Sequence, residues 1–128
     1  MSDNSLGTPR LRFVTQLPRD DGCGVAVLQM LTGKSYNDIA QTVAWRDPAV
    51  HHMAWDLMLP ALQASGFQVS ELQQTDLWSD VAGVAVVHVQ PDHFVIYDAT
   101  TGEFYDPGKP TGPSGEPAAQ PLSFVSII

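Results

Sequence analysis

The sequence predicts an α+β fold in which helices come first and an antiparallel sheet follows. In the first half of the chain, apolar residues recur at helical spacing in segments that end at Gly33 and Gly66. In the second half, short apolar or alternating segments predict strands, and Ala-Thr-Thr-Gly at 99–102 predicts a hairpin between two of them. Helices followed by strands are typical of this fold class.

Three helices are predicted, over residues 23–31, 36–45 and 54–64. Gly33 follows the first helix and is a suitable C-cap, because glycine adopts the left-handed conformation without strain. Ser35 precedes the second helix and is a suitable N-cap. Pro60 lies inside the third helix, where we expect a kink or a break.

The strands are predicted over residues 11–16, 67–72, 83–89, 93–98, 103–106 and 122–127. Residues 107–121 hold five prolines and three glycines, which favours a surface loop, and the last strand returns the chain to the same sheet. Residues 1–10 are expected to form a flexible N-terminal arm and residues 11–128 a single domain, because this length suffices for one core.

Composition argues against several classes of protein. One cysteine excludes an internal disulfide and fits a reducing compartment. No apolar run approaches the ~20 residues that span a bilayer, and the N-terminus has no hydrophobic signal core, so we expect no membrane segment and synthesis in the cytoplasm. Export without a signal, as an effector, stays open. A net charge of −8 with six Lys and Arg argues against a nucleic-acid partner.

Cys23 is the candidate nucleophile. Polar, turn-forming residues precede it and an apolar stretch follows, which places the thiol at a helix N-terminus. There the free backbone N–H groups and the helix dipole favour a thiolate. A single cysteine is more often a small buried apolar residue, but the helix start and the flanking glycines favour a nucleophile here.

A cysteine nucleophile needs a base and a group that orients the base, and His93 and Asp106 are the candidates. If Asp98 pairs with Glu103 across a four-residue loop, Asp106 lies opposite Val95, diagonal to His93 on the same face. A loop longer or shorter by one residue would put the two side chains on opposite faces.

The other histidines have simpler interpretations. His88 is expected to be a core or rim residue of its strand. His51 and His52 are expected to be loop residues near the cleft, because two adjacent histidines without a third ligand are weak evidence for a metal. We predict neither a metal nor a cofactor. Gln16, upstream of the cysteine, is the candidate oxyanion donor together with the Cys23 backbone N–H.

The chain resembles the papain-like cysteine peptidases, and within that family the C39 branch of bacteriocin-processing peptidases. The resemblance rests on Gln16, Cys23-Gly24-Val25-Ala26, Ser65-Gly66-Phe67, His93-Phe94-Val95 and Asp106-Pro107-Gly108. It implies a helical lobe packed on an antiparallel sheet, and cleavage of an amide or isopeptide in a peptide or protein substrate by a Cys-His-Asp triad. Gln16 stands one residue farther from the cysteine than is usual in the family.

Other functions remain open on the same residues. A deamidase, a transglutaminase or an amidase-type toxin or effector would use the same triad, since all of them pass through an acyl group on the cysteine. The remaining alternative is a peptide-binding domain of this type without turnover. The presence of Cys23 argues against it.

Overall fold

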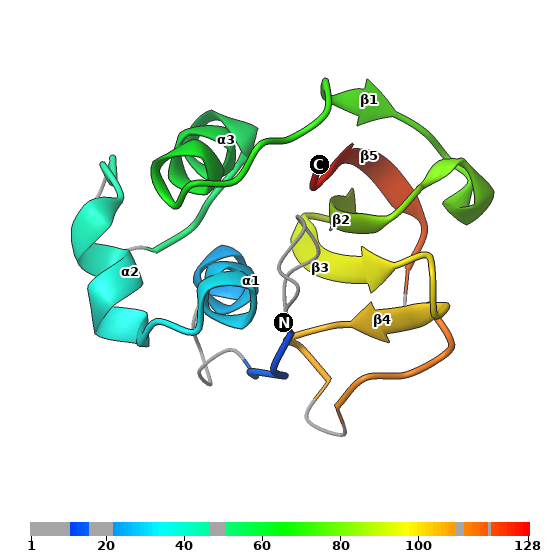
Figure 1. Cartoon of the computed structure of the whole chain (residues 1–128), viewed down its shortest axis with the longest axis horizontal. Helices are drawn as coiled ribbons and strands as arrows, with labels where there is room; N and C mark the ends of the chain where they lie inside the picture. Colours follow the sequence, from blue (N-terminus) through cyan, green and yellow to red (C-terminus); the bar gives the residue numbers. More distant parts are fainter. Residues whose placement is uncertain (1–10, 16–21, 47–50, 110–111, 118) are drawn as a thin grey trace, which may run out of the picture.

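The helices and the sheet form two layers (Figure 1). The computed structural model of the chain describes residues 11–15, 22–46, 51–109, 112–117 and 119–128. The helices are α1 (Cys23–Thr32), α2 (Tyr36–Thr42) and α3 (Trp55–Ala64). The strands are β1 (Gln73–Gln74), β2 (Val84–Val89), β3 (His93–Asp98), β4 (Glu103–Tyr105) and β5 (Pro121–Ser126), with a short 3-10 helix, η1 (Trp78–Asp80), between β1 and β2. Over these ranges the predicted α+β class is confirmed.

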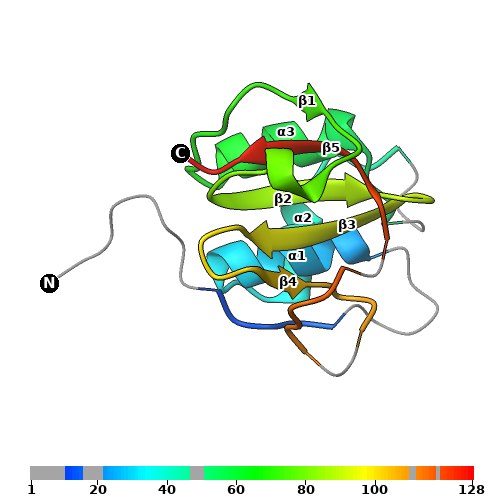
Figure 2. The same cartoon turned by 90° about the vertical axis from the view of Figure 1, so that its right-hand side faces the viewer.

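The sheet is antiparallel throughout, with the strand order β1-β5-β2-β3-β4. Figure 2 shows this order along the sheet, with the helices on the far side. The β3–β4 hairpin has the predicted register, since Asp98 pairs with Glu103 and Ile96 with Tyr105. Gly102 lies in the turn at φ 75°, a conformation that favours glycine. This register brings residues just beyond β4 toward the start of β3.

Helix α1 lies at the centre of the core, next to α2, α3 and β3 (Figure 1). Almost all of its side chains are buried, because the helix is apolar around most of its circumference. The core on this side of the sheet includes Val27, Leu28, Met53, Phe94 and Ile96. The helix ends as predicted at Gly33, which is at φ 75° and donates its N–H to the Gln29 carbonyl at 2.8 Å.

The second helix begins where the sequence predicts and ends earlier. The Ser35 hydroxyl caps α2 by accepting a hydrogen bond from the Asp38 N–H at 3.1 Å. The chain leaves the helix at Val43, because the Trp45 indole N–H donates to the Ala40 carbonyl at 2.8 Å and folds the next residues back. The Trp45 ring also stacks on His51, with centroids 4.6 Å apart.

The third helix continues through Pro60 without a break. Pro60 is on the exposed face, and the first turn is closed by hydrogen bonds from the N–H groups of Leu57 and Met58 to the Ala54 carbonyl. The buried side chains Met58 and Leu62 hold α3 against the core. None of the helices in the described ranges is long and apolar enough to cross a membrane.

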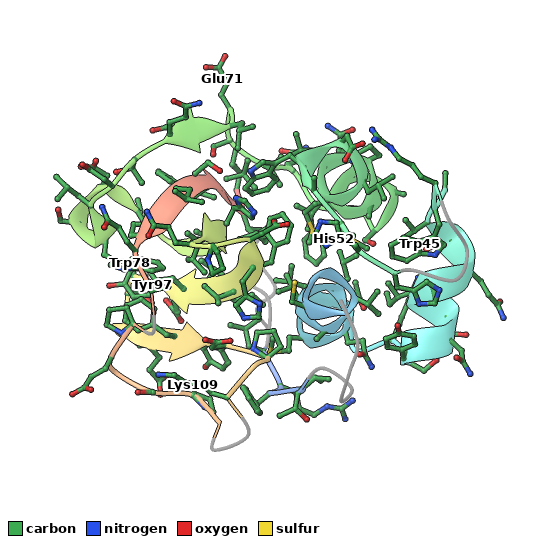
Figure 3. All side chains as sticks on the ribbon, turned by 180° about the vertical axis from the view of Figure 1, so that it is seen from behind. Trp45, His52, Glu71, Trp78, Tyr97 and Lys109 are labelled. Atoms are coloured by element: carbon green, nitrogen blue, oxygen red, sulfur yellow. The ribbon has the colours of Figure 1, made fainter. Side chains whose placement is uncertain are left out.

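The face of the sheet opposite the helices carries a smaller apolar cluster. Trp78 of η1 packs edge-on against Tyr97 and Phe104, with ring centroids 5.2 and 4.7 Å apart. Figure 3 shows Trp78 and Tyr97 together on this face. Successive side chains of β2 and β3 point alternately into the two apolar clusters. Both faces of these strands are therefore buried.

Two predicted strands are wrong in whole or in part. Residues 11–15 form no strand, although Leu11, Phe13 and Val14 pack on the core. Residues 67–72 make only an isolated bridge between Val69 and Ile127, and the regular strand is β1 further along. An alternating pattern identifies an apolar face but not a partner strand, which explains both errors. The predicted N-terminal arm, residues 1–10, lies outside the described residues.

Candidate active site

Cys23 is the first residue of α1, as the sequence predicts. The preceding residue, Gly22, has no side chain to cap the helix, and its carbonyl accepts the first helical hydrogen bond from the Ala26 N–H at 2.9 Å. The first turn also carries no acidic side chain. The positive end of the helix dipole therefore acts on Cys23 without a neighbouring carboxylate of its own turn. The residue is 5% exposed.

Gly24 brings a second segment close to the nucleophile. A Cβ atom at this position would lie 2.8 Å from the Met53 Sδ and 3.0 Å from its Cβ and Cγ. Such distances are shorter than van der Waals contact, so only glycine allows Met53 to lie this close to the start of α1. Met53 is fully buried. The segment before α3 is thereby packed against the residue that follows Cys23.

His93 and Asp106 meet as the hairpin register predicts. The His93 Nε2 lies 2.6 Å from the Asp106 Oδ1, and the two side chains are 23% and 10% exposed. His93 is the first residue of β3, and Asp106 directly follows β4. Because Nε2 is bonded to Asp106, Nδ1 is the ring nitrogen that remains for the thiol.

The backbone after Asp106 holds its carboxylate in place. The Gly108 N–H donates to the same Oδ1 atom at 2.8 Å, and the Lys109 N–H donates to the Asp106 carbonyl at 2.9 Å. A Cβ atom on Gly108 would lie 3.2 Å from the Asp106 Oδ1 and 3.4 Å from the His93 Nε2. The Asp-Pro-Gly turn therefore both closes the hairpin end and fixes the carboxylate against the imidazole.

The charge state of His93 follows from its neighbours. Burial alone would lower the pKa of His93, but its hydrogen bonds with Asp106 and then with Cys23, together with the charges of both partners, raise the pKa to about 9. The imidazole is therefore positively charged at neutral pH.

The pKa of Asp106 is shifted in the opposite direction to that of His93. Burial would raise the pKa of its carboxyl, but the hydrogen bond from His93, the Gly108 N–H and the positive charges of His93 and Lys109 lower it below the ordinary value. At neutral pH Asp106 is thus an anion and His93 a cation. Cys23, His93 and Asp106 thus place a sulfur, a charged imidazole and a carboxylate next to one another in space. Such an arrangement can deliver a nucleophile and a proton to one reacting centre.

The remaining predicted residues fall in different places. Gln16 lies outside the described residues. His51 accepts or donates a hydrogen bond with the Tyr36 hydroxyl at 2.7 Å and stacks on Trp45, so it is part of the helical layer. His88 bonds to Asp92 at 2.7 Å, which agrees with a satisfied rim residue.

Sequence reasoning missed two supports of this region. The first is Gly108, although Asp-Pro-Gly already indicates a turn that aims a backbone N–H at the aspartate. The second is Asp92, which bonds to His88 and also to His52, 3.1 Å away. Nothing local in the sequence marks the His52 contact, because the two residues are far apart in the chain. Across the described part of the chain, no group of three or more His, Cys, Asp or Glu could hold a metal ion.

Comparisons of the chain with protein-family models, with curated proteins and with solved structures found no match.

Proposed function

We propose that the protein is a papain-like cysteine peptidase or a closely related amide hydrolase, with Cys23 as nucleophile, His93 as acid and base, and Asp106 as the group that orients His93. The observation that carries the proposal is the 2.6 Å contact between Asp106 and a His93 imidazole whose other neighbour is Cys23 at a helix N-terminus. A structural cysteine needs neither a charged imidazole nor a buried carboxylate behind it.

The reaction divides into two steps. The Cys23 thiolate attacks the substrate carbonyl carbon, the C–N bond breaks, and the imidazolium of His93 gives its proton to the leaving amine. This leaves a thioester on Cys23 and a neutral imidazole. Water then attacks the thioester while His93 takes one of its protons, and the C–S bond breaks to release a carboxylic acid, which loses its proton to solvent. The proton on His93 and the thiolate on Cys23 are thereby restored.

The negative oxygen that forms at the carbonyl needs hydrogen-bond donors. The N–H groups of the first turn of α1 suit this role, because the turn lacks a capping side chain and an acidic residue. We propose the Cys23 N–H as one donor and the Gln16 amide as the second. Asp106 holds the tautomer of His93 and balances the positive charge of its protonated form.

The order of elements supports the papain-like assignment. The nucleophile begins the central helix of the helical layer, and the base and its partner come from neighbouring strands of an antiparallel sheet. Together with the motifs at Cys23, His93 and Asp106, this order favours the C39-like peptidases within that class. The substrate is then an amide or isopeptide in a peptide or protein.

The fate of the acyl group separates hydrolysis from its alternatives. Wild-type protein is incubated with a proteome digest in heavy-oxygen water, with and without a primary amine, and products are identified by mass spectrometry. New termini carrying heavy oxygen support a peptidase. Glutamate formed from glutamine without chain cleavage indicates a deamidase, and amine incorporation indicates a transglutaminase.

Variants with matched size serve as controls. Cys23→Ser and His93→Gln retain similar shapes at the site and remove the nucleophile and the base. Loss of every product in both variants supports the triad. Products that persist in Cys23→Ser would refute the proposed nucleophile, and binding of peptides without any product would favour a domain that recognises peptides without turnover.

A further inference from the structure

A second group of polar side chains lies beside the candidate site. The carboxylate of Asp92 bonds through Oδ1 to the His88 Nε2 at 2.7 Å and through Oδ2 to the His52 Nε2 at 3.1 Å. His88 and Asp92 belong to the β2–β3 hairpin, whereas His52 belongs to the segment before α3. The carboxylate therefore connects the sheet to the helical layer, and Figure 3 shows His52 between α1 and α3.

Both ends of this connection adjoin the candidate catalytic residues. Asp92 directly precedes His93 in the chain. His52 directly precedes Met53, which lies against Gly24, the neighbour of Cys23. The contact between Asp92 and His52 thus joins the two segments that carry the base and support the nucleophile.

The start of β3 needs such support because its backbone pairing is one-sided. His93 pairs with Val89 of β2, but β4 ends at Tyr105 and its last pair is with Ile96. Among the described residues, no strand pairs with His93 on the side away from β2. His88 is itself fixed, since its ring lies against Phe94 with centroids 5.0 Å apart. Asp92 is therefore anchored on the sheet and reaches toward the helical layer.

We propose that Asp92 is a positioning residue, which through His52 holds the His93 segment at its working distance from Cys23. This inference rests on the proposed function. Asp92 touches neither Cys23 nor the reacting atoms in this assignment, and acts through its neighbours. Its side chain is 52% exposed and that of His52 41%, so the effect of the pair is modest, about three- to five-fold on a rate that depends on the Cys23–His93 geometry.

The test uses iodoacetamide, which alkylates Cys23 without a known substrate. The rate reports how much of the sulfur is thiolate paired with His93. We expect Asp92→Ala and His52→Ala each to slow alkylation at neutral pH by about three- to five-fold. The double variant should be no slower than Asp92→Ala, because Asp92→Ala already removes the contact with His52. His52→Gln should restore most of the rate, since its amide nitrogen replaces the imidazole Nε2.

The matched control is Asp56→Ala, which breaks the exposed ion pair between Asp56 and Arg46 on the helical layer. Its alkylation rate should equal that of the wild type. Asp92→Asn serves if Asp92→Ala does not fold, and circular dichroism and thermal unfolding confirm that each variant is native. A loss in Asp92→Ala without a loss in His52→Ala would overturn the inference, because the carboxylate would then act by its charge or through His88 and not through His52.

The alkylation rates distinguish a failure of the positioning role from a failure of the proposed function. If wild-type Cys23 reacts quickly and depends on His93 while Asp92 and His52 variants match the wild type, only the positioning role is refuted. If wild-type Cys23 reacts as an ordinary thiol and His93→Ala changes nothing, the triad is refuted and the positioning role with it.

Discussion

Replacing Asp106 by asparagine removes a negative charge from the candidate site and keeps an oxygen at the same place. The amide oxygen of the variant still accepts the hydrogen bond that the Gly108 N–H donates at 2.8 Å. The His93 imidazole loses a charged partner 2.6 Å from its Nε2. The variant therefore isolates the charge of Asp106 from its role in the turn.

The size of the effect follows from the pKa of His93. Its rise from 6.5 to about 9 corresponds to about 3 kcal/mol for the whole surroundings of the imidazole. The ring is partly exposed and Cys23 supplies part of the rise, so we assign roughly 1 kcal/mol to the charge of Asp106. Asp106→Asn should then lower the pKa of His93 from about 9 toward 6.5 by about 1 pH unit.

NMR titration of the His93 ring protons measures this pKa directly. Asp106→Asn should titrate at a lower pH than the wild type, and alkylation of Cys23 at neutral pH should be slower by up to about tenfold. Asp56→Asn, on the surface of the helical layer, should leave the titration of His93 unchanged. An unchanged His93 titration in Asp106→Asn would refute the reasoning, because the carboxylate would then not stabilise the charged imidazole.

Three further predictions address packing, pH and the oxyanion. Gly24→Ala should lower the free energy of unfolding by about 1–3 kcal/mol in urea titrations, because its Cβ would overlap the buried Met53. His93 stabilises the fold fully below pH 6.5 and loses this effect as the pH rises through about 9, so the stability of wild type relative to His93→Gln should fall by about 1 kcal/mol over that range. Gln16→Ala should reduce turnover by about 10²–10³ with little change in KM if its amide is an oxyanion donor, and a near-wild-type rate would remove Gln16 from the site.

Local signals in the sequence account for most of the fold that was predicted correctly. The start of α1 at Cys23, the cap at Ser35 and the end of α1 at Gly33 each depend on residues within one turn. The register of the β3–β4 hairpin depends on a short turn, and from it the contact between His93 and Asp106 follows.

Contacts that no periodic pattern specifies account for what the sequence did not predict. Leu11, Phe13 and Val14 pack on the core without a strand, because alternation does not specify a partner. Helix α2 ends early where the Trp45 indole bonds to the Ala40 carbonyl and stacks on His51. These contacts are local in the chain, but they depend on side chains that the helical spacing does not place. The connection from Asp92 to His52 joins two elements across the layers and leaves no periodic pattern in the chain.

The reactivity of Cys23 in the native protein tests the central claim most directly. Alkylation by iodoacetamide is followed at about pH 6, where an ordinary thiol is almost wholly protonated, for native and for urea-unfolded protein. We expect native wild type to react faster than the unfolded chain, because His93 and the start of α1 favour the thiolate, whereas native His93→Ala reacts more slowly than its unfolded form. A native wild type that is slower than the unfolded chain, with His93→Ala behaving in the same way, would contradict the account and leave Cys23 as a buried structural residue.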